Sequence, residues 1–283
     1  MTIPETVGVV GGGRMGAGIA HAFLLAGARV TVLERDDAAA QAASAALHRV
    51  VVASVERGST TESVADLTGR ATMATDAAEL AGTSLVVEAV PEDFVLKAEV
   101  LRRLEGVLAD DAFLATNTSS LSIDDLGATL RRPERFVGLH FFNPVPSSSL
   151  VEIVRGEQTG AEIVDRALTW VADLGKTPIV VQNSPGFAST RLGAIVALEA
   201  IRMLEQGVAS AEDIDTAMVL GYKYPVGPLR LTDMVGLDVR LGIAEYLERT
   251  LGDRFAVPDL LREHVAAGRL GRKSGQGFFS WDS

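Results

Sequence analysis

The chain has 283 residues, of which 47% are apolar and 22% charged, a composition typical of a globular protein with one large or two ordinary domains. Because 26 Lys and Arg residues face 37 Asp and Glu residues, the net charge is −11, and neither nucleic acid nor an anionic membrane is expected as a partner. The absence of cysteine excludes disulfides, thiolate nucleophiles and Cys-ligated zinc, and the four histidines show no metal-ligand spacing, so no bound metal is expected.

The start of the chain and its hydropathy bear on location. Residues 1–6 contain no basic region followed by an apolar stretch. The sequence also has no run of about 18 apolar residues, the length that spans a bilayer. We therefore expect neither secretion nor a membrane span, and predict a cytoplasmic protein.

The first predicted elements are a strand, a glycine-rich turn and a helix. A short apolar run leads directly into Gly11, Gly13 and Gly16, and an Ala-rich apolar stretch follows. In the dinucleotide-binding fingerprint the first glycine permits a tight turn, the second lets a pyrophosphate approach the backbone, and the third lets helix and strand pack closely. The helix N-terminus would face the phosphates, and the predicted cofactor site also includes Arg14 and Met15.

The second predicted strand, residues 29–33, ends in Glu34, about 20 residues beyond the fingerprint, where an acid binds the adenosine ribose hydroxyls. A carboxylate repels a 2′-phosphate, so NAD is the expected cofactor. Arg35 leaves NADP open as an alternative, because a guanidinium beside this position can accommodate the extra phosphate. We interpret Arg35 as a solvated charge at a strand end.

Strand and helix signals alternate over about the first 180 residues. The Ala-rich residues 36–57 contain neither Gly nor Pro and predict a long helix or a helical hairpin arm. Further strands are predicted at 85–88, 113–116, 136–140, 150–154 and 178–181, and helices at 93–108 and 161–174. This alternation predicts an α/β fold with a doubly wound, mostly parallel sheet, in which ligands bind at the carboxyl ends of the strands.

The pattern changes after Asn183-Ser184-Pro185-Gly186. Helical periodicity without strand signals continues over 187–205 and 211–220, and Pro and Gly residues divide the remainder into shorter helices. We therefore predict a nucleotide-binding domain over 1–183 and an all-α domain over 184–283.

Two residues suited to acid–base chemistry lie in neighbouring predicted strands. His140 ends one strand, so it would face the ligand crevice, and imidazole exchanges protons near neutral pH. Glu152 lies in the next strand, where a carboxylate can orient the ring and stabilise the imidazolium. The spacing leaves open that His140 is only a hydrogen-bonded strand-end residue and that Glu152 is solvated.

A hydroxyl-rich segment, Asn117-Thr118-Ser119-Ser120, follows another predicted strand. Its position would place Ser119 at the crevice, where the hydroxyl can hydrogen-bond a substrate oxygen. The alternative is a helix N-cap before Ile123, a task that Ser120 or Ser122 would perform equally well.

These features together resemble the L-3-hydroxyacyl-CoA dehydrogenase family, especially its short bacterial 3-hydroxybutyryl-CoA dehydrogenase members, over essentially the whole chain. The motifs that carry the resemblance are Gly11-x-Gly13-x-x-Gly16 with Met15, Val87-Glu88-Ala89-Val90-Pro91-Glu92, Asn117-Thr118-Ser119-Ser120, His140-Phe141-Phe142-Asn143-Pro144-Val145-Pro146, Leu150-Val151-Glu152, Ser184-Pro185-Gly186-Phe187, Pro225-x-Gly-Pro228 with Gly236-Leu237-Asp238, and Lys273-x-Gly275-x-Gly277-Phe278.

The resemblance implies a Rossmann-like NAD-binding domain and a helical C-terminal domain for substrate binding and dimerisation, so we expect a homodimer. It implies oxidation of a short-chain L-3-hydroxyacyl-CoA to the 3-ketoacyl-CoA with reduction of NAD. By the same resemblance, His140 is the general base and Glu152 its partner. Ser119 touches both substrate and cofactor, and Asn143 lies near the nicotinamide.

Three further cofactor contacts are implied by the resemblance alone. Glu92 and Lys97 are expected to contact the cofactor from the first domain. Lys273 is expected to reach it from the C-terminal end.

The chain departs from the family pattern at one expected active-site position. Thr190 stands where the family usually has Asn, and a hydroxyl is shorter than an amide and lacks its second polar group. We therefore include Thr190 among the catalytic positions and expect reduced activity. Further departures, which bear on acyl-chain preference, domain-junction contacts and CoA binding, are Ser147-Ser148-Ser149 in place of a Met-Lys pair, Gln182-Asn183 in place of Lys-Asp, and a helical arm with Arg49 and Arg57 but no Lys.

Two alternative functions stay open from the sequence. One is a dehydrogenase of a free 3-hydroxy acid of the gulonate or carnitine type, although the motif from His140 to Pro146 favours the CoA branch. The other is a non-catalytic NAD(H)-binding protein, for which Thr190 is the main support.

Overall fold

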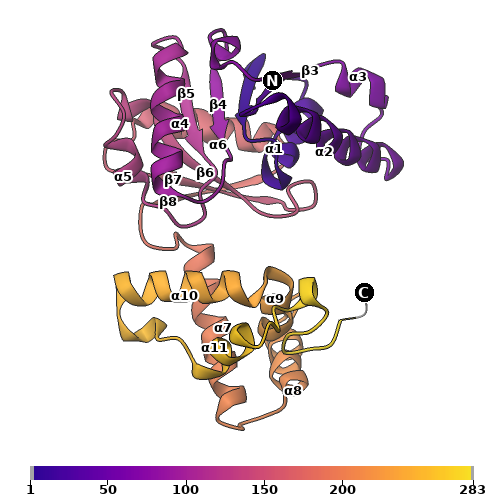
Figure 1. Ribbon diagram of the computed structural model, residues 1–283, viewed down its shortest axis with the longest axis vertical. Coiled ribbons are helices and arrows are strands. Elements are labelled where there is room, and N and C mark those ends of the chain that lie inside the picture. Colours follow the sequence, from indigo (N-terminus) through magenta and orange to yellow (C-terminus); the bar gives the residue numbers. More distant parts are fainter. Residues whose placement is uncertain (1–2, 282–283) are drawn as a thin grey trace. The chain divides into compact units, whose positions relative to one another are not determined.

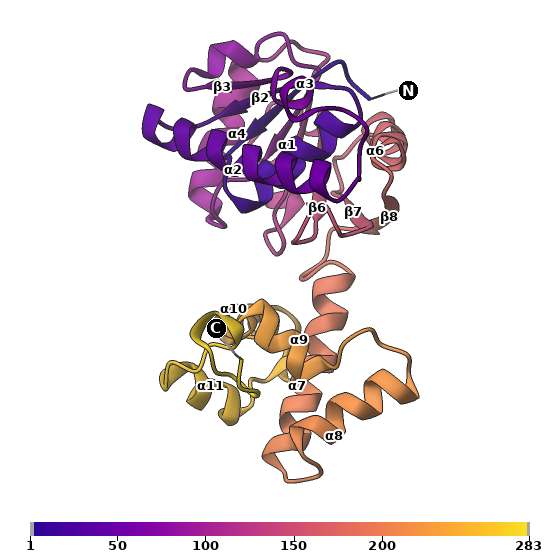
Figure 2. The same ribbon diagram turned by 90° about the vertical axis from the view of Figure 1, so that its right-hand side faces the viewer.

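The computed structural model describes residues 3–281 and divides the chain into two compact units, Met1–Ser184 and Pro185–Ser283 (Figures 1 and 2). The sequence-based boundary lies between residues 183 and 184. Each unit has an apolar core of its own.

The first unit is built on one eight-stranded sheet of order β3-β2-β1-β4-β5-β6-β7-β8. The strands are β1 (Thr6–Val10), β2 (Arg29–Leu33), β3 (Ala71–Ala74), β4 (Leu85–Glu88), β5 (Phe113–Thr116), β6 (Phe136–Phe141), β7 (Leu150–Arg155) and β8 (Thr177–Gln182). Strands β3 to β6 in this order are parallel, whereas β7 runs antiparallel to β6 and β8 runs parallel to β7. The doubly wound, mostly parallel sheet is therefore confirmed, and β3 is an additional edge strand.

Helices follow most of the strands, as the alternating pattern predicts. They are α1 (Arg14–Leu25), α2 (Asp37–Glu56), α3 (Val64–Thr68), α4 (Phe94–Val107), α5 (Ile123–Gly127) and α6 (Ala161–Asp173), with short 3₁₀ segments η1 (Ala77–Leu80) and η2 (Pro133–Arg135). The predicted helix over 36–57 is the single helix α2, not a hairpin, because Asp36 caps its start and it runs unbroken to Glu56.

The strand order reverses beside β1, which neighbours both β2 and β4. Parallel crossovers are right-handed, so α1, which leads to β2, and α4, which leads to β5, lie on opposite faces of the sheet. Ligands of such sheets bind in the crevice at the carboxyl ends of the strands where the order reverses. In this sheet the order reverses at the segments that follow β1 and β4, so the crevice is expected there.

The sheet is buried on both sides, as expected for parallel strands covered by helices. All residues of β4, β5 and β6 are buried, and strand side chains join those of α1, α2 and α6 in one apolar cluster. A rigid, close-packed sheet holds the strand ends, and hence the site, in fixed positions.

Helix α2 has the length and composition that could cross a membrane. Its Ala40, Ala43, Leu47 and Val51 recur at helical spacing and are buried against the sheet and α1. A core-facing stripe of this kind is also typical of a surface helix in a globular domain.

The second unit consists of helices packed around α7 (Figure 2). They are α7 (Ser189–Glu205), α8 (Ala211–Thr216), the π-helical segment η3 (Ala217–Gly221), α9 (Pro228–Val235), α10 (Leu237–Leu251), α11 (Asp259–Ala266) and the 3₁₀ segments η4 (Asp253–Phe255) and η5 (Arg272–Ser274). Helix α7 begins two residues later than predicted, because the buried Phe187 has a left-handed φ of 49° that a helix cannot include. The single helix predicted over 211–220 is divided in the structure into the α-helix α8 and the π-helical segment η3.

Candidate active site

The turn between β1 and α1 has the shape that the fingerprint predicts. Gly11 has a φ of +91°, and a Cβ there would lie 2.9 Å from the carbonyl oxygen of Ala89. A Cβ on Gly16 would overlap the backbone oxygen of Gly11, so this position requires glycine for close packing. A Cβ on Gly13, in contrast, would meet no atom within 4 Å. A side chain would therefore clash with the backbone at Gly11 and Gly16, whereas the space next to Gly13 is open.

The start of α1 fits the phosphates of a dinucleotide. Its N-cap residue Gly13 makes no side-chain cap hydrogen bond, and its first turn contains no acidic residue. Backbone N–H groups and the positive end of the helix dipole thus face the open space above Gly13. Arg14 is exposed and Met15 partly buried in this first turn.

Glu34 is held beside the same turn. Its Oε1 accepts a hydrogen bond of 2.6 Å from the Gly12 N–H, and its Oε2 accepts one of 3.3 Å from the Arg35 N–H. The carboxylate is thereby fixed at the end of β2, where an acid would bind ribose hydroxyls. The guanidinium of Arg35 is 84% exposed and pairs with Asp36 at 3.1 Å, which supports its interpretation as a solvated charge.

His140 and Glu152 form a buried pair across two antiparallel strands. The register of β6 and β7 places them directly opposite each other, so their side chains share one face of the sheet. The Nδ1 of His140 lies 2.7 Å from Oε2 of Glu152, and the two residues are 6% and 0% exposed. The structure thus brings together the two residues that the sequence analysis singled out.

The Glu152 carboxylate selects the tautomer of His140. A carboxylate accepts hydrogen bonds, so Nδ1 carries the proton and donates it toward Oε2, which leaves the lone pair on Nε2. The ring of Phe142 lies 4.4 Å from the His140 ring, centroid to centroid. An oriented imidazole with a basic Nε2 can accept a proton and hold it as an imidazolium stabilised by Glu152.

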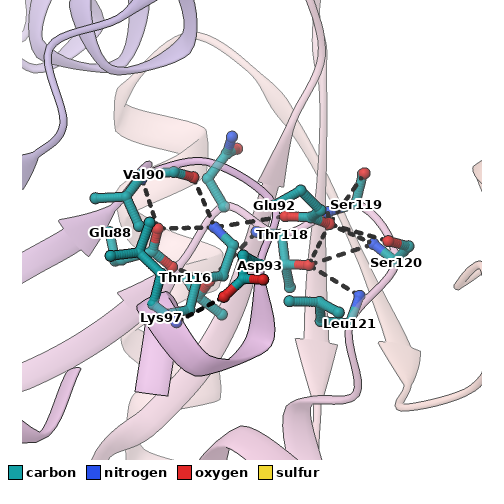
Figure 3. A network of polar contacts seen from close by, with 12 residues as sticks. Glu88, Val90, Glu92, Asp93, Lys97, Thr116, Thr118, Ser119, Ser120 and Leu121 are labelled. Carbon is teal, nitrogen blue, oxygen red and sulfur yellow. Dashed lines mark hydrogen bonds and ion pairs between the residues drawn. The ribbon is translucent and has the colours of Figure 1, made fainter. Parts of the chain in front are cut away.

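Ser119 lies in a loop that is organised by Glu92 (Figure 3). Oε1 of Glu92 accepts hydrogen bonds from the Thr118 hydroxyl at 2.6 Å, the Ser119 N–H at 2.9 Å and the Ser120 N–H at 3.1 Å. It also accepts from the hydroxyls of Ser119 at 3.3 Å and Ser120 at 3.0 Å. One carboxylate oxygen is therefore the common hydrogen-bond acceptor of the loop that follows β5.

The helix α5 is capped by Ser122, not by Ser119 or Ser120. The side chain of Ser122 accepts a hydrogen bond of 3.1 Å from the Asp125 N–H and caps α5. Ser119 and Ser120 instead turn toward Glu92 (Figure 3).

Lys97 is buried beneath this loop and does not lie at the surface of the crevice. Its side chain is 1% exposed, and Nζ lies 2.7 Å from Oε1 of the fully buried Glu88 and 3.5 Å from Oε2 of Glu92. Partial burial by itself would raise the pKa of Glu92, but the Lys97 charge and the hydrogen bonds from the Ser119 loop lower that pKa below its ordinary value. Glu92 therefore remains ionised at neutral pH.

Asn143 lies in the exposed loop between β6 and β7. The loop is anchored from two sides. Nζ of Lys176 donates to the carbonyl oxygens of Val145 at 2.7 Å and Ser148 at 2.6 Å, and Val145 packs where Gly18 of α1 lacks a side chain. Burial lowers the pKa of the Lys176 ammonium. Asn143 thus lies in an anchored loop that begins just after β6, the strand that carries His140.

The remaining predicted residues, Thr190 and Lys273, belong to the second unit. Thr190 is partly buried in the first turn of α7. Nζ of Lys273 forms an ion pair with Asp238 at the start of α10, at 2.6 Å from Oδ2. Among residues 3–281 no group of His, Asp and Glu is arranged to hold a metal ion.

Comparison with known proteins assigns both units. The family model described as 3-hydroxyacyl-CoA dehydrogenase, NAD binding domain, matches residues 6–184, and the corresponding C-terminal domain matches residues 186–281. The chain belongs to the 3-hydroxyacyl-CoA dehydrogenase family.

Individual relatives agree with this assignment along the full length. A probable 3-hydroxybutyryl-CoA dehydrogenase of Deinococcus radiodurans is 40% identical over 97% of this chain and 99% of its own. A 3-hydroxybutyryl-CoA dehydrogenase of Mycobacterium tuberculosis is 41% identical over 98% of both chains. The crystal structure of (S)-3-hydroxybutyryl-CoA dehydrogenase from Ralstonia eutropha superposes with a TM-score of 0.94 at 40% identity, covering 99% of this chain and 100% of that one.

Within the 3-hydroxyacyl-CoA dehydrogenase family, the predicted fold, NAD cofactor and dehydrogenase class are confirmed. No role was predicted for Glu88, although the residue lies in one of the quoted motifs. The signal that could have identified it is a charged residue at the end of an otherwise apolar strand. Its partner Lys97 lies on the buried side of α4, and a sequence pattern does not show that burial.

Proposed function

We propose that the protein oxidises a short-chain L-3-hydroxyacyl-CoA to the 3-ketoacyl-CoA with NAD, and that His140 is the general base. The observation that carries this proposal is the buried hydrogen bond between Nδ1 of His140 and Glu152 at the end of β6, in a domain of the NAD-binding family. Relatives named 3-hydroxybutyryl-CoA dehydrogenase support the substrate class.

The chain's own residues can perform the proton transfer. Nε2 of His140 takes the proton of the substrate hydroxyl, and Glu152 stabilises the resulting imidazolium across the 2.7 Å contact. Bound NAD would supply the acceptor for the hydride that leaves the carbinol carbon. Glu92 holds Ser119. We expect the Ser119 hydroxyl to hydrogen-bond the substrate oxygen and thus to orient the carbinol.

Cofactor binding would rest on the first unit. The open space above Gly13 and the uncapped start of α1 suit a pyrophosphate, and Glu34 suits the adenosine ribose. The resemblance adds Arg14, Met15, Glu92, Lys97, Asn143 and Lys273 as cofactor contacts. The burial of Lys97 favours an indirect role for that residue.

We also propose a homodimer formed through the second unit. Leu192, Leu220, Tyr222, Met234 and Val239 of this unit are large apolar side chains with 46% to 75% of their surface exposed. Large apolar side chains exposed in this number are typical of surfaces that are covered in an oligomer. The net charge of −11 and the core-facing side of α2 support a cytoplasmic protein that binds neither nucleic acid nor membranes.

A substrate panel combined with one variant tests the catalytic proposal. The wild-type protein should oxidise NADH with acetoacetyl-CoA and with 3-ketoacyl-CoAs of graded length, best at short chain length and better than NADPH. His140→Ala should lower kcat by about 1,000-fold because the base is removed, while the Kd for NADH stays unchanged. Turnover only with free 3-keto acids would favour a dehydrogenase of free 3-hydroxy acids. No turnover despite NADH binding would favour a non-catalytic NAD(H)-binding protein. Full turnover of His140→Ala would refute the assignment of the base.

A further inference from the structure

We infer that the buried Glu88–Lys97 pair is a positioning device that holds Glu92, and through it the Ser119 loop, in the geometry required for turnover. The inference rests on the proposed function, since it assigns a task to residues beneath the proposed substrate loop. It gives Glu88 a role, and it gives Lys97 a positioning role in addition to its expected contact with the cofactor.

Glu88 is fully engaged at the end of β4 (Figure 3). Its side chain is 0% exposed, and its Oε1 accepts from Lys97 Nζ at 2.7 Å and from the Val90 N–H at 2.6 Å. Its Oε2 accepts from the Thr116 hydroxyl of the neighbouring strand β5 at 2.6 Å. Four segments of chain thus meet at this carboxylate: the end of β4, the turn after it, α4 and β5.

The ammonium of Lys97 is surrounded by oxygen atoms of the protein, two of which accept its hydrogen bonds. An ammonium has three N–H donors and no acceptor. Nζ of Lys97 has three acceptors around it: Glu88 Oε1 at 2.7 Å, the Val90 carbonyl oxygen at 3.1 Å and Glu92 Oε2 at 3.5 Å. With 1% of its side chain exposed, Lys97 acts on the crevice through its charge and through Glu92.

Glu92 divides its two oxygens between the buried cation and the loop. Oε2 faces Lys97 at the long distance of 3.5 Å, which leaves Oε1 free to accept from the Thr118, Ser119 and Ser120 groups at 2.6 to 3.3 Å. Glu88 carries the shorter and stronger contact to Lys97. If that contact were lost, the ammonium would draw the Glu92 carboxylate inward, and the loop would lose its common acceptor.

Single and joint replacement of Glu88 and Lys97 distinguish a role in fold stability from a role in positioning Glu92. Removing one partner of a buried ion pair leaves an uncompensated charge and strongly destabilises a fold, whereas replacing both with uncharged groups of similar volume is often neutral. A device needed only for folding would therefore tolerate the joint replacement. A positioning device would not, because Glu92 would then lack the charge that orients it.

The test compares Glu88→Gln, Lys97→Met and the double variant Glu88→Gln/Lys97→Met in the full chain. Thermal unfolding, kcat and KM with acetoacetyl-CoA and NADH, and amide hydrogen exchange of residues 117–122 are measured. We expect both single variants to lose stability and turnover. The double variant should regain most of the stability while its kcat stays about 10- to 100-fold low and the amides of 117–122 exchange faster than in the wild type.

A matched control is Leu101→Ala on the same helix. Leu101 is fully buried in α4 but takes no part in the polar network, so its truncation should lower stability without changing exchange at 117–122 or kcat below the unfolding temperature. Recovery of wild-type kcat, KM and loop protection in the double variant would overturn the inference. If the wild type fails to turn over 3-ketoacyl-CoAs, the proposed function fails, and the exchange experiment still decides the positioning because it needs no turnover.

Discussion

Thr190 stands where the resemblance described above implies an Asn in the family. It lies in the first turn of α7 and carries a hydroxyl in place of that side-chain amide. We predict that Thr190→Asn raises kcat about 10-fold, because an amide reaches further and offers both a donor and an acceptor. Steady-state kinetics with acetoacetyl-CoA would measure this, with Ser189→Asn one position earlier as a control. A fall in turnover on the true substrate would contradict the prediction.

His21 is a second residue with a physical signature of its own. It is 1% exposed in α1, and neither ring nitrogen has a hydrogen-bond partner among the described residues. Burial, aided by the charges of Arg57 and Lys176, lowers the pKa of His21 from 6.5 to about 4. The imidazole is therefore neutral in the folded protein over the whole range in which the unfolded chain takes up a proton.

This lowered pKa makes stability depend on pH. Between pH 6.5 and about 4 the unfolded chain binds a proton that the folded chain does not, so the free energy of unfolding decreases as pH falls, by about 3 kcal/mol over the window. We predict that His21→Leu removes this part of the acid sensitivity and adds about 1 kcal/mol at neutral pH, because an unpaired buried polar ring is replaced by an apolar side chain. Urea unfolding at pH 7 and pH 4.5 would show it, and the exposed His48→Leu should leave the difference unchanged. An equal acid loss in wild type and His21→Leu would disprove the assignment.

At the scale of elements, the β1-turn-α1 unit assigns different tasks to its glycines. Gly16 packs against the backbone of Gly11, whereas Gly13 faces open space with a φ of −62° that alanine adopts without strain. Gly13→Ala should fold with nearly wild-type stability but bind NADH at least about 10-fold more weakly, because its methyl group occupies the space predicted for the pyrophosphate. Gly16→Ala should instead lower the unfolding temperature markedly. Thermal unfolding and fluorescence titration with NADH separate the two effects, and unchanged NADH affinity in Gly13→Ala would place the phosphates elsewhere.

The strands that sequence reasoning found, and the one it missed, differ in their surroundings. The central strands β4 and β5 are apolar runs buried on both faces, and such runs are visible in a sequence. β3 has only four residues, Ala71–Ala74, with one of them fully buried, and it pairs with β2 alone at the sheet edge. A short edge strand without an apolar run gives no local signal, because the neighbouring strand supplies its stability.

For the whole molecule, the proposed homodimer can be tested directly. Leu220 and Tyr222 of the second unit are 65% and 75% exposed, and burying them would stabilise a dimer. We predict that the wild type has about twice the chain mass of 29.8 kDa in light scattering, and that the double variant Leu220→Lys/Tyr222→Lys shifts toward the monomer mass. Val180→Lys, on a half-exposed position of the first unit, is the control and should keep the wild-type mass. A monomeric wild type would refute the dimer.

The sequence by itself determined the glycine turn, seven of the eight strands, the acid at the end of β2 and the family, because these depend on residue type and short spacing. The tertiary structure decided the rest. The antiparallel register of β6 and β7 places His140 opposite Glu152. The packing of α4 against the sheet brings the Lys97 ammonium into contact with the Glu88 carboxylate. Both contacts join distant parts of the chain, and their geometry depends on strand direction and burial, which arise only when the whole sheet and its helices pack together.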